Sequence, residues 1–251
     1  MHIGENMNHI SFTDRAPIVI QGALDSELDL LLNTFPLLQT RKVGTFDFHE
    51  CIYKNRPVVI SKTKIGEICS AIATTLAIQT YHPTLILNQG TAGALVDWLN
   101  TGDIIVGKRV CYLSEFSTDT MRDAEAINPW KSDAYRSCDG DILSYDADPA
   151  ILKTIARIFE HSAQEIHFDI IGSGDVWTKD PQKIHEINRS LGAVCECMEC
   201  AGAYLSANSL GTPIVSIRAI SNNELKAQTY DQASGVLAQK FVLSLLDRLL
   251  L

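Results

Sequence analysis

The chain has 251 residues, of which 46% are hydrophobic, and its formal net charge is −9 at pH 7. This length is enough for one large core and is common among single α/β domains. No run of 18 apolar residues is present, so we expect no membrane-spanning helix. The acidic balance and the scattered lysines and arginines argue against a large nucleic-acid interface and favour a small molecule as the partner.

Two further features of the composition concern the organisation of the chain and its compartment. The first 15 residues are polar and lack the apolar stretch of a signal peptide. We therefore expect a polar N-terminal extension at 1–15 and a single domain at 16–251. The seven cysteines form no regular framework, which is typical of reduced thiols in the cytoplasm.

Short apolar runs rich in β-branched residues alternate with longer segments of helical period. In chain order we predict strand 17–20, helix 25–35, strand 57–60, helix 66–81, strands 84–87 and 103–106, helix 149–161, strand 169–171, helices 181–191 and 199–209, strand 213–217 and helix 230–250. This alternation is typical of the α/β class. We expect one three-layer α/β/α domain with a mostly parallel or mixed central sheet.

The segment 114–148 differs from the rest because it is polar, weakly periodic and dotted with aromatic residues. A long irregular segment in a compact domain is often a functional or interface loop. A solvated surface excursion is the equally good alternative, and the sequence leaves both open.

In parallel α/β sheets, ligands bind at the carboxyl ends of strands, so the turns that follow the predicted strands are the places to search. The first turn, QGALDSE at 21–27, combines small residues with acids. Asp25 and Ser26 are explained by the start of a helix, where acids interact favourably with the helix dipole. Glu27 is open both to that explanation and to a functional one.

Two further turns consist mainly of small residues, NQGTAGA at 88–94 and GSGDVW at 172–177. Such turns let backbone N–H groups approach an oxygen-rich ligand closely, although each alone is a weak signal. Trp177 is either a core residue or a ring on which a base stacks.

A further acid stands where an apolar strand gives way to a helix of small residues. Glu199 would be costly to bury there without a ligand or a partner. Arg218 is the candidate partner, so an ion pair is the alternative to a bound ligand. Cys195, Cys197 and Cys200 lack a second cluster of metal ligands, and we interpret them as small core residues rather than zinc ligands.

Taken in this order, the segments resemble the purine nucleoside phosphorylase superfamily and, within it, the methylthioadenosine/S-adenosylhomocysteine nucleosidases. The similarity runs over about 18–250 and is carried by seven segments in matching order and spacing. They are GALDSE (22–27), KIGEICSAIATT (64–75), LNQGTAGAL (87–95), GDIIV (102–106), GSGDVW (172–177), CMECA (197–201) and IVSIRAIS (214–221). The resemblance implies a homodimer without a metal or organic cofactor, with 114–148 near the interface or over the pocket for the 5′ substituent.

The resemblance also implies roles for individual residues. Glu27 would orient and deprotonate the attacking water, and Glu199 would accept hydrogen bonds from the ribose 2′ and 3′ hydroxyls. The other implied pocket residues are Thr91, Ala92 and Gly93 on the water and ribose side, Met198 under the sugar, Trp177 against the purine, the Thr178 backbone at the base edge, Leu24 and Tyr230 near the 5′ substituent, and Ser221 with Asn222 at the purine end. Cleavage of an N-glycosidic bond passes through an oxocarbenium-like state, which a nearby carboxylate stabilises.

At the purine end the chain departs from these relatives, whose motif ends in Ile-Ser-Asp. Here it reads Ile220-Ser221-Asn222, and an amide can donate a hydrogen bond but cannot transfer a proton at neutral pH. General acid catalysis is worth about 10²–10⁴-fold, or about 3–5 kcal/mol of barrier. We therefore expect adenine nucleosides to be slow substrates, and either 6-oxopurine nucleosides to be preferred or activity to be low.

The leading hypothesis is a nucleosidase that hydrolyses a purine nucleoside. A 6-oxopurine nucleoside phosphorylase is one alternative, but Asp25 and Glu27 would repel phosphate, and no arginine stands between 58 and 105 to bind it. A non-catalytic nucleoside-binding or storage protein is the other alternative, which Asn222 suggests. The presence of both Glu27 and Glu199 argues against it, because a binder has little need of a base that activates water.

Overall fold

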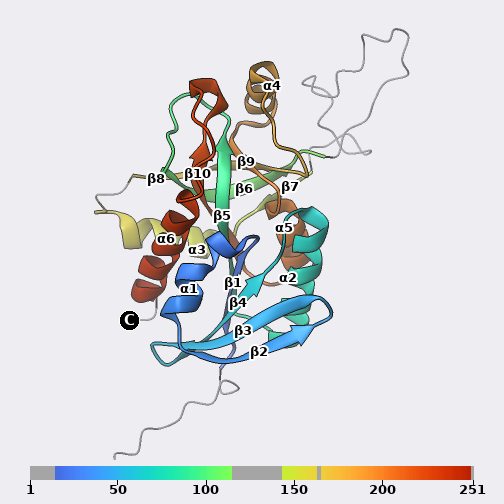
Figure 1. Ribbon diagram of the computed structural model, residues 1–251, viewed down its shortest axis with the longest axis vertical. Coiled ribbons are helices and arrows are strands. Elements are labelled where there is room, and N and C mark those ends of the chain that lie inside the picture. The colour runs from blue at the N-terminus through green and yellow to red at the C-terminus, as the bar shows by residue number, and fades with distance from the viewer. Residues whose placement is uncertain (1–14, 115–142, 163–164, 250–251) are drawn as a thin grey trace, which may run out of the picture.

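The computed structural model describes residues 15–114, 143–162 and 165–249. Most of the predicted extension at 1–15 and most of the segment 114–148 therefore lie outside the described residues, and the domain boundary at residue 16 stays a prediction. The described chain forms a three-layer α/β/α domain built on one mixed sheet, so the predicted fold class is confirmed (Figure 1).

The order of strands and helices follows the predicted alternation. The strands are β1 (Ile18–Gly22), β2 (Leu37–Val43), β3 (Phe46–Tyr53), β4 (Arg56–Lys62), β5 (Leu85–Ala94), β6 (Ile104–Tyr112), β7 (Ser144–Asp146), β8 (Ile166–Ser173), β9 (Ala193–Cys197) and β10 (Ile214–Asn222). The helices are α1 (Asp29–Thr34), α2 (Glu67–Tyr81), α3 (Pro149–Phe159), α4 (Pro181–Leu191), α5 (Cys200–Ser209) and α6 (Ser234–Leu249), with short 3₁₀ helices η2 (Asp25–Glu27) and η4 (Glu224–Lys226).

The structure differs from the prediction mainly at the β2–β3–β4 meander. We did not predict β2, β3 or β7. The residues of β2 are nearly all exposed and carry no apolar pattern. The turn between β3 and β4 contains Lys54 and Asn55, both with positive φ (48° and 61°), as a two-residue hairpin turn requires. The predicted helix 25–35 is also divided, into η2 and α1, and α6 begins at Ser234 rather than at 230.

Strand β5 is the centre of the sheet. It pairs in parallel with β1 and with β10, and its last residues pair antiparallel with β9. Strand β10 in turn pairs with β6, which is followed by β8 and then β9. The five strands β5, β10, β6, β8 and β9 therefore close into a ring, while β1, β4, β3 and β2 extend the sheet away from it.

Helices cover the two faces of the sheet (Figure 1). α6 packs on β5 and β10 together with α1 and α3, and α2 pairs with α5 on the opposite side. Within the described ranges, no helix combines the length and the apolar character needed to cross a membrane. Gly202 of α5 lies so close to α2 that a Cβ there would be 3.0 Å from the carbonyl carbon of Glu67 and nearer still to its oxygen. Because Gly202 has no side chain, α5 can pack this closely against α2.

We predict that Gly202→Ala destabilises the fold, because the added methyl group has to push α2 and α5 apart. Overpacking of this kind costs about 1–3 kcal/mol, measurable as a lower midpoint in urea unfolding. Ser209→Ala, an exposed change in the same helix, should leave the midpoint almost unchanged. Equal stability of the two variants would contradict the close packing of the two helices.

Candidate active site

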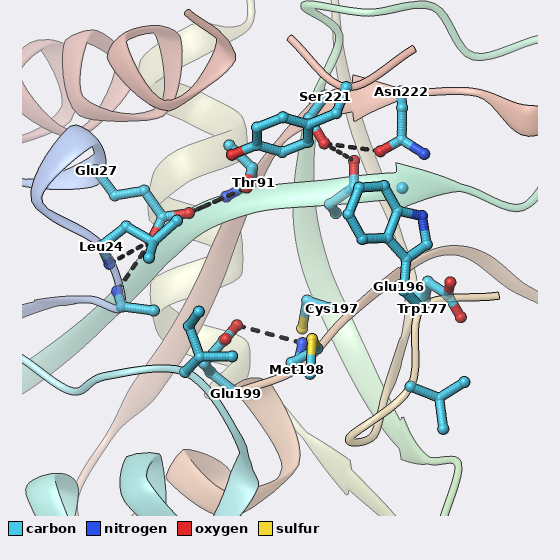
Figure 2. A pocket seen from close by; sticks show the side chains of 16 residues that line it. Leu24, Glu27, Thr91, Trp177, Glu196, Cys197, Met198, Glu199, Ser221 and Asn222 are labelled. Atoms are coloured by element: carbon cyan, nitrogen blue, oxygen red, sulfur yellow. Dashed lines mark hydrogen bonds between the residues drawn. The ribbon is translucent and has the colours of Figure 1, made fainter. Parts of the chain in front are cut away.

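The carboxyl ends of β1, β5, β9 and β10 surround a cavity of about 290 Å³, close to the lower end of the range for small-molecule pockets (about 300–1,000 Å³). Its lining residues are Ala23, Leu24, Glu27, Ile65, Thr91, Ala92, Gly93, Val176, Trp177, Glu196, Cys197, Met198, Glu199, Ser221, Asn222 and Tyr230 (Figure 2). Every residue that we predicted for the site lines this cavity except Thr178.

Glu27 stands at one end of the cavity, on the 3₁₀ helix η2. Its Oε2 accepts hydrogen bonds from the N–H groups of Ala23 (2.9 Å) and Leu24 (3.2 Å). Its Oε1 accepts from the N–H (2.8 Å) and the hydroxyl (3.1 Å) of Thr91. Part of the role of Glu27 is therefore structural, because it caps the turn that carries it. The same bonds fix a buried carboxylate beside β5 and at the cavity wall.

Glu199 lies between β9 and α5, and its half-buried carboxylate also faces the cavity. The hydrogen bond found for this carboxylate comes from the N–H of Met198, at 3.2 Å. Burial raises the pKa of Glu199 to about 8, and negative charge at Cys197 and Glu27 adds to the effect. A positive charge entering the cavity would favour the ionised form of this acid.

The ion pair between Arg218 and Glu199, the alternative to a bound ligand at Glu199, is not formed among the described residues. The guanidinium is fully buried under the sheet and donates to the backbone oxygens of Asn88 and Ile217, at 3.0 Å each, and to the side-chain oxygen of Asn88, at 2.5 Å. Its charge still opposes the rise in the pKa of Glu199. It therefore acts on Glu199 through the electrostatic field, and the carboxylate stays open towards the cavity.

A buried network holds the segment that carries Glu199. Glu67, on α2, accepts hydrogen bonds from the hydroxyl of Ser173 and from the N–H of Gly202 (2.5 Å). The Ser173 hydroxyl oxygen in turn accepts from the N–H of Ala201 at 3.1 Å. Burial raises the pKa of Glu67 to about 7. These bonds tie the end of β8 and the start of α5 to α2, and so fix the position of Glu199.

The opposite end of the cavity is formed by the last residues of β10. Asn222 is 3% exposed, and its Oδ1 accepts a hydrogen bond from Ser221 (2.9 Å) while its Nδ2 donates to Glu224 (3.3 Å). Asn222 is in register with Gly93, which has no side chain to fill the space beside the amide. An amide N–H can therefore be presented to a ligand at this end.

Trp177 is not a core residue: it is 48% exposed and lines the cavity, as the interpretation in terms of a stacking ring requires. Its ring lies 5.9 Å from that of Tyr230, and the ammonium group of Lys179 lies 4.8 Å from its centroid. Tyr230 is 40% exposed and precedes α6. The two rings together form an aromatic wall of the cavity, and Figure 2 shows the Trp177 ring in this wall.

Thr178 does not line the cavity, although the resemblance implied that its backbone meets the edge of the base. Its N–H donates to Glu196 at 2.6 Å and its hydroxyl donates to the same carboxylate at 2.8 Å. Glu196 does line the cavity, although our sequence analysis gave it no role. Its position in a buried strand, three residues before Glu199, was the one signal available. Ile65 and Cys197 were missed in the same way.

The three neighbouring cysteines give no sign of a metal site. Cys195 and Cys200 are fully buried, and the thiol of Cys200 lies 3.1 Å from the hydroxyl of Ser216. In the part of the chain that the structure describes, no group of three or more potential ligands is placed to hold a metal ion.

Comparison with known proteins agrees with this geometry. The family model described as the Phosphorylase superfamily matches residues 17–250, and the chain belongs to this family. Among curated proteins it is similar to the 5′-methylthioadenosine/S-adenosylhomocysteine nucleosidase of Staphylococcus aureus (strain bovine RF122 / ET3-1). The two are 26% identical over 242 residues, which are 92% of this chain and 100% of the relative.

Solved structures show the same fold. The S-adenosylhomocysteine nucleosidase of Streptococcus pyogenes, in complex with 5-methylthiotubericidin, aligns with a TM-score of 0.78 at 24% identity, over 94% of this chain and 98% of that one. A futalosine hydrolase mutant of Helicobacter pylori strain 26695 aligns with a TM-score of 0.76 at 21% identity, over 93% and 100%. Proteins with different named substrates therefore share this architecture.

Proposed function

We propose that this protein hydrolyses the N-glycosidic bond of a purine nucleoside, as the names of its nucleosidase relatives suggest. The observation that carries the proposal is that Glu27 and Glu199 approach one cavity from separate elements. The cavity also offers an aromatic wall and, beyond it, an amide at the other end. These are the groups that water activation, ribose binding and purine binding require.

In the proposed reaction, Glu27 accepts a proton from water as the water attacks the anomeric carbon. A positioned base of this kind contributes about 10²–10⁴-fold to the rate. Glu199 binds the ribose hydroxyls and stabilises the positive charge that develops on the sugar, an interaction that is stronger in the transition state than in the bound substrate. The base leaves with a hydrogen bond from Asn222 to its N7.

Water is a better acceptor than phosphate in this proposal. The side of the cavity opposite the base consists of Glu27 with Thr91, and a phosphate dianion there would be repelled by the carboxylate. The test is incubation with methylthioadenosine, S-adenosylhomocysteine, adenosine, inosine and guanosine, with and without phosphate. Release of free base without phosphate supports hydrolysis, release only with phosphate supports a phosphorylase, and binding without release supports a storage protein.

We predict that Glu27→Gln lowers kcat by at least about 10²-fold, because an amide cannot take the proton from water. The nucleoside should still bind, since its sugar and base contacts lie elsewhere. Calorimetric binding and single-turnover release of base measure the two effects separately. Asp25→Asn is the matched control, as Asp25 is exposed and pairs with Lys62 outside the cavity (2.6 Å). Wild-type turnover in the Glu27→Gln variant would show that Glu27 is not the base.

We predict that Asn222→Asp raises kcat/KM for adenine nucleosides by up to about 10²–10⁴-fold, the range for general acid catalysis. The new carboxyl group would lie beside Glu224, which is 3.3 Å from the amide nitrogen that it replaces. Like charges raise a carboxyl pKa, so the introduced acid should keep a proton to give to N7. An unchanged or lower rate on adenosine would count against this account of the purine end.

We also propose that the protein acts as a homodimer and works in the reducing cytoplasm. The thiols of all six described cysteines are unpaired, which supports such a compartment. The dimer is supported by exposed apolar side chains on the paired helices α2 and α5, namely Ile68 (72%), Ile72 (46%) and Leu205 (49%). The patch continues to Ile65, which lines the cavity, so a second copy would cover the surface beside the site.

We predict that Ile68→Glu lowers the mass in sedimentation from that of a dimer towards 27.7 kDa, because the interface would then have to bury an unpaired charge. Leu38→Glu is the control, since Leu38 is exposed to a similar extent (54%) but lies on the edge strand β2. A wild-type mass of one chain would exclude the proposed dimer.

A further inference from the structure

Glu196 is the acid of this cavity that the proposed mechanism does not use. It stands on β9, is 5% exposed and contributes to the cavity wall. Both of its oxygens are engaged by one neighbour: Thr178 donates its N–H to Oε1 (2.6 Å) and its hydroxyl to Oε2 (2.8 Å). The carboxyl group is therefore held in one orientation.

The sheet brings Glu196 to the same end of the cavity as Asn222. Gly93 on β5 is in register with Glu196 on one side and with Asn222 on the other. Side chains of paired residues lie on the same face of a sheet, and neighbouring strands are about 4.8 Å apart. The side chains of Glu196 and Asn222 thus lie on either side of Gly93, about two strand spacings apart. Gly93 has no side chain to fill the space between them. Figure 2 shows both, with Trp177, at the end of the cavity away from Glu27.

This end of the cavity has free capacity to accept hydrogen bonds. An ionised carboxylate has about four acceptor positions, and Thr178 occupies two of them. No lysine or arginine forms an ion pair with Glu196 among the described residues. Burial raises its pKa to about 7, and negative charge at Cys197 and Glu224 adds to the rise. A buried acid in such surroundings is stabilised by a ligand that supplies an N–H donor.

Purines differ in what they present at this edge. N1 of adenine is an acceptor with a lone pair, which is repelled by the ionised carboxylate of Glu196, the form that predominates above its pKa of about 7. N1 of hypoxanthine or guanine carries a hydrogen, and guanine adds an amino group next to it. A charge-assisted hydrogen bond from that N1–H fits the free acceptor positions of Glu196.

We propose that Glu196 selects purines that carry a hydrogen on N1, so that 6-oxopurine nucleosides are the substrates of this protein. The inference rests on the proposed nucleosidase function and assigns its substrate class. Glu196 contacts the N1 edge, while the amide of Asn222 meets the N7 side of the same base. A site built to accept a particular hydrogen bond can reject a ligand that lacks the donor by about 10⁴–10⁵-fold, and we expect at least a 10²-fold preference for inosine over adenosine.

The test compares kcat/KM for inosine, adenosine and 1-methylinosine. 1-Methylinosine keeps the 6-oxo group but has lost the N1 hydrogen, so it separates recognition of the N1 hydrogen by Glu196 from recognition of the 6-oxo group. We expect inosine to exceed both of the others by at least 10²-fold. Equal use of inosine and 1-methylinosine would overturn the proposal.

Glu196→Gln is the decisive variant. Its Oε1 can still accept the Thr178 N–H, and its amide can donate to the Thr178 hydroxyl, which only has to rotate. A second amide hydrogen then points into the cavity and suits the N1 lone pair of adenine. We expect the ratio of inosine to adenosine kcat/KM to fall by at least 10²-fold, whereas Glu165→Gln, an exposed change (82%), should leave it unchanged. An unaltered ratio in a folded Glu196→Gln protein would overturn the proposal.

Binding of the free bases separates this inference from the proposed function. Calorimetry with hypoxanthine and adenine reports on Glu196 whether or not any nucleoside is cleaved. A preference for hypoxanthine that Glu196→Gln removes supports the role of Glu196, even if the failure to release base refutes the nucleosidase. Equal affinities for the two bases in both proteins overturn the role of Glu196, even if hydrolysis is observed.

Discussion

Two glycines on the central strand make room for the functional groups of this cavity. A Cβ at Gly90 would lie 2.8 Å from Oε1 of Glu27, and a Cβ at Gly93 would lie 3.4 Å from the amide atoms of Asn222. Strand β5 cannot move away, because it is bonded to β1, β10 and β9. At these two positions the cavity is therefore bounded by the backbone of β5, which is hydrogen-bonded within the sheet. The groups that can contact a ligand are mainly the side chains around this strand.

Those side chains make the cavity favour positive charge. Glu196 and Glu199 both line it, and burial raises the pKa of Glu196 to about 7 and that of Glu199 to about 8. The buried cation Arg218 acts against this preference, because its charge opposes the rise in the pKa of Glu199. Its hydrogen bonds go to oxygens of Asn88 and Ile217 rather than to either acid. In the proposed reaction, such surroundings would stabilise a sugar that is becoming a cation more than the neutral nucleoside, which is the difference in binding that catalysis needs.

The sequence was sufficient for the parts of the fold that local patterns encode. Helices such as 181–191 have clear start and stop signals, here Asp180 as the N-cap and Gly192 with φ of 68° after the last turn. The central strands are continuous apolar runs and were also recovered. Strand β2 was missed because it is exposed along nearly its whole length, so neither face leaves a pattern.

The candidate site was predictable to the extent that it lies in the turns after strands. The convergence of Glu27, Trp177, Glu199 and Asn222 follows from the order of the strands, and the resemblance to a known family supplied that order. Glu196 was not recognised because its role depends on the register of β9 against Gly93 of β5, a long-range pairing that no local pattern contains. The sequence could not decide between an Arg218 partner and a ligand for Glu199 for the same reason, since the partner of Arg218 is Asn88 of β5.

The four hydrogen bonds that Glu27 accepts have a consequence for its proposed role as the base. A carboxylate has about four acceptor positions, and the N–H groups of Ala23, Leu24 and Thr91 together with the Thr91 hydroxyl fill them all. Three of these donors are backbone N–H groups with fixed positions, whereas the Thr91 hydroxyl can rotate about a single bond to another partner. In the proposed reaction, the Thr91 hydroxyl therefore has to rotate away from Glu27 before the carboxylate can accept a proton from water, and a ligand that accepts a hydrogen bond from this hydroxyl would favour that change.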